Sequence, residues 1–390
     1  MEYVKLGDLI SLVIDYRGKT PLKLKGEWAS EGYRALSALN VKTGGLVAED
    51  KIRFVNEDLY HKWMKQEVNR GDILITSEAP FGQVLQWNSD EKIVLSQRLF
   101  AIRIKTDVDK RYVYYYMTSQ PFQGELKARA TGSTVEGLRQ PALMKCRLSL
   151  PELPLQHRIA SILSTYDTLI ENNTKRIRLL EKMAENLYKE WFVRFRFPGH
   201  ENVEMENGLP KGWKRSSLSD VCVFKRGKNI TSSEMEEGNV PVISAGLEPS
   251  GYHSCSNVKG TNVTMSSSGA NAGYIAIHDS DIWAADCSYI EETTTANIFY
   301  VYELLNNIRS VINNFQRGAA QPHVYPKDVN RIKLILPSEN LMQKANARLE
   351  MMHKEIHNLQ HQNSLLARQR DLLLPRLISG KLEVKEELLE

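Results

Sequence analysis

Two stretches of the chain follow one plan, in which a Leu-Pro pair leads into a long helical pattern. Leu150-Pro151 precedes an apolar helical repeat over 157–195, and Leu336-Pro337 precedes another over 344–378. The remainder divides into two blocks of similar length. The order block, helix, block, helix indicates an internal duplication, and this constrains the fold more than any single motif does.

Both blocks have the short apolar runs and turn residues that are typical of β structure. In the first block, runs at 9–14, 73–75 and 99–104 are bounded by Gly, Asn and Asp and predict strands. A short amphipathic helix is predicted at 112–117, with a counterpart at 299–305. Each block then closes with a loop, a strand and the Leu-Pro pair. An α+β fold with two β-rich α/β domains follows.

The beginnings of the blocks also match. Leu6-Gly7-Asp8-Leu9 before Arg17-Gly18-Lys19 parallels Leu218-Ser219-Asp220-Val221 before Arg226-Gly227-Lys228. The predicted organisation is a first domain at 1–150, a central helix at 151–197, a second domain at 198–336 and a C-terminal helix at 337–390.

Both helical stretches carry apolar residues at alternating steps of four and three, the heptad seam of a helix pair. Each seam holds one asparagine near its middle, Asn173 or Asn363. A buried asparagine would fix the register of the pair, whereas one at the wet edge of the seam would do nothing of the kind. We expect the helices to pair antiparallel within the chain, as a pseudo-two-fold coiled coil with one domain toward each end. At about 35 residues each helix would be ~50 Å long.

Composition restricts the class of protein. The 390 residues are 42% hydrophobic, enough for two or three domains with proper cores. Four widely spaced cysteines, with no signal peptide and no apolar run long enough for a membrane span, favour a cytoplasmic protein. Charge is uneven: 1–150 hold 23 basic against 18 acidic residues, while 201–336 hold 12 against 15.

Several segments resemble the specificity subunit of type I restriction-modification systems. They are the first exit with Gln156–Leu163, the loop Gly132-Ser133-Thr134 and, most specifically, the terminal Leu373–Leu382. The resemblance covers essentially the whole chain. The copies also differ, because Asp286-Cys287 stands where the first block has Ser96-Gln97, and the second exit has no isoleucine equivalent to Ile159.

The resemblance implies two target recognition domains that each read one half of a split, asymmetric site on double-stranded DNA. It further implies that the two helices set the spacer and dock two modification (methyltransferase) subunits, with a restriction and translocase subunit as a further partner. S-adenosylmethionine would then be bound by the methyltransferase subunits, and this chain would need no cofactor.

Base edges and phosphates are contacted by basic, amide and hydroxyl side chains, which are abundant in the predicted loops. For any one of these residues the sequence favours a solvated turn, but their clustering on the loops favours DNA binding for the set. Arg34 and Arg98 are the sharpest hypotheses, since a bidentate arginine reads guanine. In the first block the candidates are Lys19, Thr20, Arg34, Ser37, Asn40, Thr76, Ser77, Gln97, Arg98, Gly132, Ser133 and Thr134. In the second they are Lys228, Asn229, Ser244, Ser267, Ser268, Asn271, Gln321 and His323.

Apparent catalytic signals are incomplete. Gly18-Lys19-Thr20 mimics the end of a phosphate-binding loop, but Val13 replaces its first glycine. His353, His357 and His361 share a helical stripe without the HExxH carboxylate, so we expect a solvated or subunit-facing surface rather than a metal site. No methyltransferase motif occurs, and we expect neither a catalytic residue nor a metal ligand.

Two aromatic clusters have structural interpretations. Tyr112 and Tyr114–Tyr116 are expected in the core rather than as base-stacking residues, because they lie at helical spacing. The segment Trp191–Phe197 is expected to anchor the first long helix to the second block, and any exposed part of it would be a docking patch.

The sequence thus predicts a non-catalytic DNA-recognition subunit. The alternative is an adaptor protein, in which the β blocks bind protein and the helix pair is an assembly scaffold.

Overall fold

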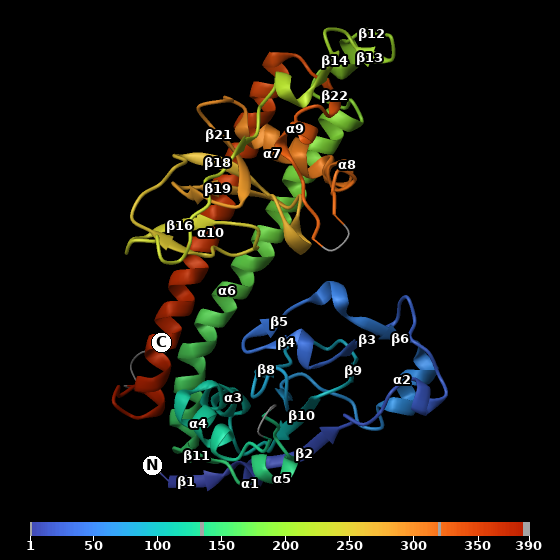
Figure 1. Cartoon of the computed structure of the whole chain (residues 1–390). Helices are drawn as coiled ribbons and strands as arrows, with labels where there is room; N and C mark the ends of the chain where they lie inside the picture. Colours follow the sequence, from blue (N-terminus) through green and yellow to red (C-terminus); the bar gives the residue numbers. More distant parts are fainter. Residues whose placement is uncertain (1, 133–135, 319–320, 385–390) are drawn as a thin grey trace. The chain divides into compact units, whose positions relative to one another are not determined.

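The computed structural model describes residues 2–132, 136–318 and 321–384, which form two compact units. Unit 1 comprises Met1–Ile170 and Ser364–Glu390, and unit 2 comprises Glu171–Asn363. Each unit therefore combines one predicted block with parts of both long helices. Both ends of the chain belong to unit 1 (Figure 1).

Unit 1 contains two main sheets. One has the strand order β2-β10-β7-β8 and the other β6-β3-β9, and β1 pairs with β11 at the exit from the block. The strands are β1 (Glu2–Lys5), β2 (Ile10–Asp15), β3 (Tyr33–Leu36), β4 (Val41–Lys42), β5 (Gly45–Leu46), β6 (Arg53–Val55), β7 (Ile73–Thr76), β8 (Val84–Gln86), β9 (Ile93–Leu95), β10 (Leu99–Ile104) and β11 (Arg147–Leu150).

Helices cover the first of these sheets and join it to the long helices. The helices of unit 1 are α1 (Leu6–Leu9), α2 (Glu57–Trp63), α3 (Lys110–Thr118), α4 (Gln120–Ala128), α5 (Gln140–Leu143) and the first part of α6 (Leu153–Tyr188). Figure 1 shows α3 and α4 beside this part of α6. Tyr112 and Tyr114–Tyr116 are buried in one core with Ile159 and Leu163 of α6 and with Leu377. The prediction that these tyrosines belong to the core is confirmed.

Unit 2 repeats the order of strands in these three sheets. Its main sheets have the orders β15-β21-β18-β19 and β17-β16-β20, and β14 pairs with β22 at the exit. The strands are β12 (Met205–Glu206), β13 (Leu209–Pro210), β14 (Lys214–Ser217), β15 (Lys225–Arg226), β16 (Val240–Ile243), β17 (Gly251–His253), β18 (Thr261–Ser266), β19 (Ile275–Asp279), β20 (Trp283–Ala284), β21 (Cys287–Glu291) and β22 (Lys333–Leu336). The predicted internal duplication is confirmed by this shared topology.

The helices of unit 2 are α7 (Ile298–Asn307), α8 (Arg309–Asn313), α9 (Pro326–Val329) and parts of α6 and α10 (Glu339–Ile378). One core joins α7 to three aromatic residues, Trp191, Phe192 and Phe197. The first two lie in a π-helical turn, Lys189–Val193, that continues α6, and Phe197 follows this turn. This aromatic segment anchors α6 to the second block, as the sequence predicts.

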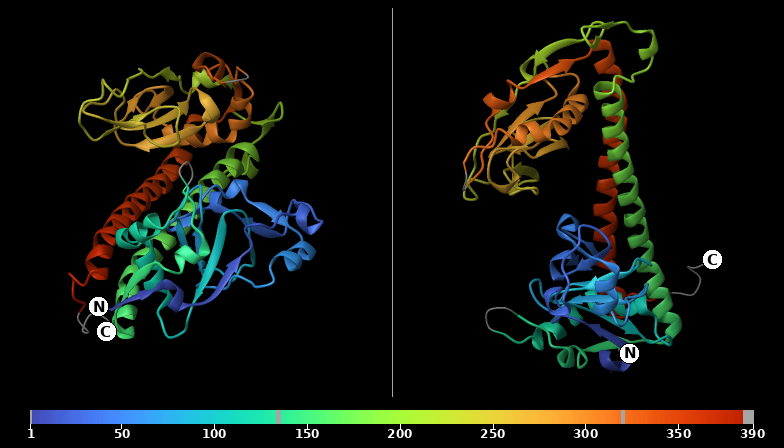
Figure 2. Two further views of the ribbon diagram at one scale, coloured as in Figure 1. Left: turned by 60° about the horizontal axis from the view of Figure 1, so that its bottom comes forward. Right: turned by 90° about the vertical axis from the view of Figure 1, so that its right-hand side faces the viewer.

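The long helices α6 and α10 begin earlier than their apolar patterns suggest. α6 starts at Leu153 rather than near residue 157, and α10 starts at Glu339 rather than near residue 344. Pro154 is compatible with this because a proline in the first turn lacks only an amide hydrogen that has no intrahelical partner. Each is one unbroken helix, as the right-hand view of Figure 2 shows.

Within each unit the helix segments run antiparallel. In unit 1, Asp167 contacts Arg370, and in unit 2, Ile177 and Leu180 pack against Leu359 and Ile356. The two asparagines face the opposite long helix in unit 2. The Asn173 side chain, on α6, donates to Gln362, and the Asn363 side chain, on α10, donates to Thr174. Asn173 is only 8% exposed, which favours the register-fixing interpretation over the wet-edge one.

The block-start match needs one correction. The Leu6 and Leu218 amides donate to equivalent carbonyls, those of Cys146 and Ile332, so the first half of the match holds. The match of Arg17-Gly18-Lys19 with Arg226-Gly227-Lys228 is out of register. Asp15 pairs with Phe100 and Arg226 with Ser288, which hold the same place in their sheets. Among the described residues, no helix is long and apolar enough to cross a membrane.

Candidate DNA-reading loops

In unit 1, the loops that follow two neighbouring strands leave the sheet at one edge. β3 and β9 are parallel, with Leu36 opposite Leu95, so their C-terminal ends coincide. The Ser96 amide donates to the Leu36 carbonyl at 2.8 Å, and the Ala38 amide donates to the Gln97 carbonyl at 3.1 Å. These bonds hold the predicted residues Ser37, Gln97 and Arg98 together.

Two further segments meet the same edge. The Ser77 amide, just after β7, donates to the Arg98 carbonyl at 2.8 Å, and the Leu138 amide donates to the Ser77 carbonyl at 2.9 Å. Leu138 follows a small hairpin closed by Thr131 and Gly137. Gly132 lies in this hairpin with φ +111, a conformation that glycine tolerates best. Ser133 and Thr134 lie outside the described residues.

Gln97 and Arg98 carry the accessible side chains at this edge. Both are exposed, and the Arg98 side chain retains 51% of its accessible surface. Arg98 has φ +62, which is rare for a residue with a side chain and is held here by the carbonyl contact with Ser77. Its guanidinium contacts only Glu78 among the described residues, at 3.3 Å. A guanidinium at this edge can bind a base or a phosphate.

Four other candidates shape the loops from within. Asn40 is 3% exposed, and its side chain accepts hydrogen bonds from the amide and hydroxyl of Ser37. Thr76 and Ser77 are also buried: the Thr76 hydroxyl accepts from the Gln83 amide, and the Ser77 hydroxyl donates to the Arg98 carbonyl. Their polar atoms satisfy the backbone of the loops, so they position Gln97 and Arg98.

Arg34, Lys19 and Thr20 are held by other groups of the protein. Arg34 donates to Glu91 at 2.7 and 2.5 Å and to Glu49 at 3.2 Å, and the hydrogen bond to Glu91 raises the pKa of its guanidinium. Lys19 donates to the Trp63 carbonyl at 2.6 Å, and burial together with Lys65 lowers the pKa of its ammonium. The Thr20 hydroxyl accepts from the Lys23 amide. Their DNA contacts stay predictions, and Arg34 would first have to release two carboxylates.

Unit 2 builds the same edge. The Ala285 amide donates to the Ile243 carbonyl at 2.7 Å, and the Val324 amide donates to the Ser267 carbonyl at 3.0 Å. A hairpin closed by Arg317 and His323 adjoins Ser268. The predicted residues Ser244, Ser267, Ser268, Asn271 and His323 are therefore brought together, and Gln321 is exposed in the hairpin.

Most of the unit 2 candidates have partners within the protein. Ser267 and Ser268 are buried, and Ser268 donates to Asp286. The Asn271 amide donates to the Ala245 carbonyl at 3.3 Å, and the hydroxyls of Ser244 and Ser250 are 3.2 Å apart. His323 stacks on Tyr325. By contrast, Lys228 and Asn229 are exposed, with the Lys228 ammonium over the Trp283 ring.

Hydrogen bonding identifies Asp286 as the counterpart of Arg98, a relation that the sequence comparison missed. The Ser77 amide donates to the Arg98 carbonyl, and the equivalent Ser267 amide donates to the Asp286 carbonyl. The Ser96 and Ala285 amides likewise share one role, so Gln97 is an insertion in the first copy. Glu78 and Ser268, the side-chain partners of Arg98 and Asp286, are also equivalent. One place thus presents a hydrogen-bond donor in unit 1 and an acceptor in unit 2.

The described residues contain no group of three or more His, Cys, Asp and Glu side chains arranged to hold a metal. Burial raises the pKa of the Cys222 and Cys287 thiols to about 12 and that of Cys146 to about 11. Few of these thiols are ionised at neutral pH, which makes them poor nucleophiles.

Comparison with known proteins identifies the family. The model of the type I restriction modification DNA specificity domain matches residues 1–182 and 210–367. The MjaIX specificity subunit of Methanocaldococcus jannaschii is 27% identical over 342 residues, 81% of this chain and 79% of that protein. The HindI specificity subunit of Haemophilus influenzae is 20% identical, with 82% and 88% of the two chains covered.

A solved structure shows the same fold. The crystal structure of a type I restriction-modification S subunit from M. genitalium superposes with a TM-score of 0.63 over 96% of this chain and 95% of that one, at 20% identity. The double match to the domain model agrees with the duplicated topology. The chain therefore belongs to the family of type I restriction-modification specificity subunits.

Proposed function

We propose that each unit reads one half of a split, asymmetric site on double-stranded DNA through the loops at its sheet edge. The observation that carries this proposal is the equivalence of Arg98 and Asp286. In the major groove, arginine donates to the acceptors of guanine, whereas a carboxylate accepts from the amino group of cytosine. Two copies with opposite chemistry at one place suit two different half-sites.

The long helices are the proposed spacer and docking surface. Helices of 36 and 40 residues correspond to about 54 and 60 Å. This length would allow for roughly one and a half turns of B-DNA between two readers. Two methyltransferase subunits would dock on the pair, and a restriction subunit would join the complex.

We assign the catalytic steps to the partner subunits. The methyltransferase subunits would bind S-adenosylmethionine and methylate an adenine in each half-site, while this chain stays non-catalytic and binds no cofactor. We place the complex in the cytoplasm, which suits the four free cysteines of this chain.

A binding selection tests the proposal. The chain, purified with the methyltransferase subunit of its own system, is incubated with a random pool of duplexes, and bound DNA is separated by gel shift and sequenced. Enrichment of a motif with two defined parts and an undefined gap is expected. Failure to bind any duplex would favour the alternative function of a protein-binding adaptor built on a helix pair.

A further inference from the structure

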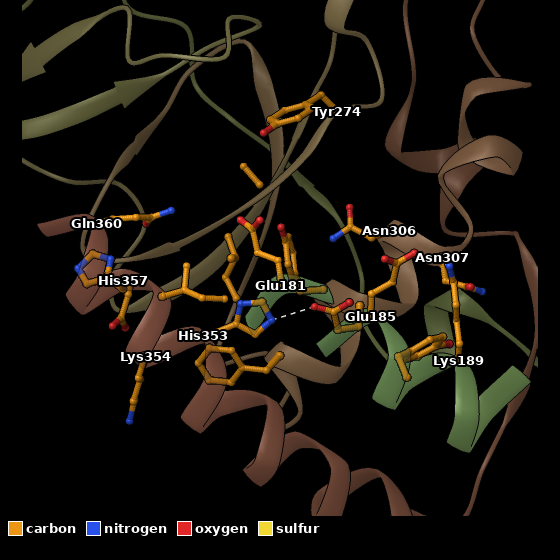
Figure 3. Close-up of a pocket in the computed structure, with 18 residues that line it drawn as sticks. Glu181, Glu185, Lys189, Tyr274, Asn306, Asn307, His353, Lys354, His357 and Gln360 are labelled. Carbon is orange, nitrogen blue, oxygen red and sulfur yellow. Dashed lines mark hydrogen bonds and ion pairs between the residues drawn. The ribbon is translucent and has the colours of Figure 1, made fainter. Parts of the chain in front are cut away.

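Unit 2 contains a cavity that DNA recognition does not use. It has a volume of about 480 Å³ and is lined by side chains of α6, α7 and α10 and by Tyr274 (Figure 3). Glu181, Glu185 and Lys189 enter it from α6 and the turn that follows, and His353 and His357 enter it from α10. Most of its lining comes from helices, and Tyr274 joins it to the DNA-reading loops, because the Tyr274 amide donates to the carbonyl of Asn271.

The cavity is acidic. Four carboxylates, those of Glu181, Glu185, Asp279 and Glu303, line it against two lysines, Lys189 and Lys354. All of these carboxylates except that of Glu303 are exposed, so the cavity can be reached from solvent. Glu185 forms an ion pair with Lys189. No salt bridge joins Glu181 to any residue in the described part of the chain. Partial burial raises the pKa of its carboxyl, although the nearby Arg178 guanidinium opposes the rise.

At the floor of the cavity, His353 and Glu303 form a buried pair with Nε2 and Oε1 2.9 Å apart. Their side chains are 8% and 7% exposed. The expectation of a solvated surface is therefore wrong for His353. Although it is polar, His353 lies at the helical spacing of the apolar residues that form the seam, and α7 covers it.

The duplication tells which residues of unit 1 correspond to this cavity. α6 and α10 begin at equivalent places, three residues after Leu150 and Leu336. Counted from these starts, His353 corresponds to Asp167, Glu185 to Asp371 and Ala184 to Arg370.

The same relation holds for the shorter helices. The amides of Arg111 and Tyr112 in α3 and those of Phe299 and Tyr300 in α7 all donate to a capping side chain. This register makes Tyr302 the counterpart of Tyr114 and Glu303 the counterpart of Tyr115.

In unit 1 the corresponding place is filled by a guanidinium. Arg370 donates to Asp167 and to Asp371, and the Tyr115 hydroxyl donates to the same Asp167 carboxylate at 2.5 Å. Although burial opposes it, the hydrogen bond to Asp167 raises the pKa of the Arg370 guanidinium. In unit 2 the counterparts of all these neighbours line the cavity, but Ala184 replaces the arginine.

We propose that the cavity of unit 2 receives the guanidinium of an arginine from a docked methyltransferase subunit, in the place that Arg370 fills in unit 1. This inference rests on the proposed docking of methyltransferase subunits. Carboxylates repel the phosphates of DNA, which excludes nucleic acid as the occupant. A planar guanidinium can bind two carboxylates, as Arg370 binds Asp167 and Asp371. In unit 2 the carboxylates available to it are Glu185, the counterpart of Asp371, and Glu181, which is added by α6. The two copies then offer unequal docking surfaces, because the first is already filled from within.

The test uses the full chain with the methyltransferase subunit of the same system. The double variant Glu181→Gln/Glu185→Gln neutralises the two exposed carboxylates that α6 contributes and keeps the shape of the cavity. The matched control is Glu171→Gln on α6, where the replaced carboxylate is exposed, pairs with Lys175 and lies outside the cavity. Complexes are titrated and their stoichiometry is followed by native mass spectrometry, and circular dichroism checks that each variant is folded.

For the double variant we expect one of the two methyltransferase subunits to bind at least about ten-fold more weakly, so that one-to-one complexes accumulate. The Glu171→Gln control should titrate as the wild-type chain does. A double variant that binds both subunits as the wild type does would overturn the inference and leave the proposed function intact. A wild-type chain that binds no methyltransferase subunit would overturn the docking proposal itself, and the inference with it.

Discussion

Units 1 and 2 satisfy the same backbone groups with different side chains. At the start of α3, Asp109 accepts from the amides of Arg111 and Tyr112 at 2.8 and 3.1 Å. At the start of α7, the equivalent amides are bound at 3.0 and 3.1 Å by Asn346, which reaches across from α10. The first amides of a helix need hydrogen-bond acceptors in either copy, but different side chains can supply them.

Side-chain charge also differs between equivalent positions at two further places. Arg98 corresponds to Asp286 at the sheet edge, and Arg370 corresponds to Ala184 in the long helices. The first copy is net basic and the second net acidic. The difference teaches that the two copies share a backbone plan, while the surfaces proposed to meet DNA and partners differ in charge.

The largest expected effect is on DNA recognition. Arg98→Ala should remove about 1–3 kcal/mol of discrimination in one half-site, because a bidentate contact to guanine would be lost. Competition binding of the methyltransferase complex to duplexes altered in either half measures it.

Arg34→Ala is the matched comparison for that variant. Since Glu91 and Glu49 already hold this guanidinium, the substitution should lower the free energy of unfolding and leave base preference unchanged. If Arg98→Ala left both affinity and preference as they were, the assignment of Arg98 would be wrong.

The second expected effect is on stability. It concerns the place in the long helices that Arg370 fills in unit 1 and that its counterpart Ala184 leaves unfilled in unit 2. Arg370→Ala leaves the half-buried Asp167 without its counter-charge and should lower the free energy of unfolding of unit 1 by about 2 kcal/mol. Urea unfolding measures the change. The exposed Arg368, on the same helix, is the control, and Arg368→Ala should change stability by less than about 0.5 kcal/mol. Equal effects of the two substitutions would contradict the role of Arg370.

The smallest effect concerns the two helix caps and depends on pH. Burial opposes ionisation of Asp109, but hydrogen bonds from His157 and from the Tyr112 and Arg111 amides outweigh it and lower its pKa. The resulting stability is present above the ordinary value of about 3.9 and is lost as pH falls through the lower folded-state pKa. Asp109→Asn should therefore cost about 1 kcal/mol near pH 7 and less toward pH ~3.

Urea unfolding at several pH values distinguishes this from a purely steric effect. A cost of Asp109→Asn that stays constant with pH would show that the charge of Asp109 is not what stabilises the cap. The neutral cap of unit 2, Asn346, should show no such acid dependence.

Much of the fold could be predicted from the sequence because its signals are periodic. The seam of α6 and α10, the exits at Leu150 and Leu336 and the tyrosines of α3 all follow from spacing alone. Helix starts were less predictable, because Leu153 and Glu339 precede the apolar repeat.

The site was harder to predict. Residue types located the loops, but they could not separate exposed Arg98 from buried Thr76 and Ser77, since burial depends on how four distant segments meet. The equivalence of Arg98 and Asp286 was hidden by the extra Gln97. The sequence also held no sign of the cavity in unit 2. The residue that distinguishes it from unit 1 is Ala184, and an alanine does not point to any binding chemistry.

The most direct test of two different readers on one scaffold is a map of methylated adenines. DNA from a host that carries the chain and its methyltransferase subunit is sequenced by a method that detects N6-methyladenine. The account predicts one motif with two unlike halves separated by a gap of undefined bases, and an Arg98→Ala chain should relax only one half. A continuous or palindromic motif, or one whose two halves both change with Arg98→Ala, would contradict it.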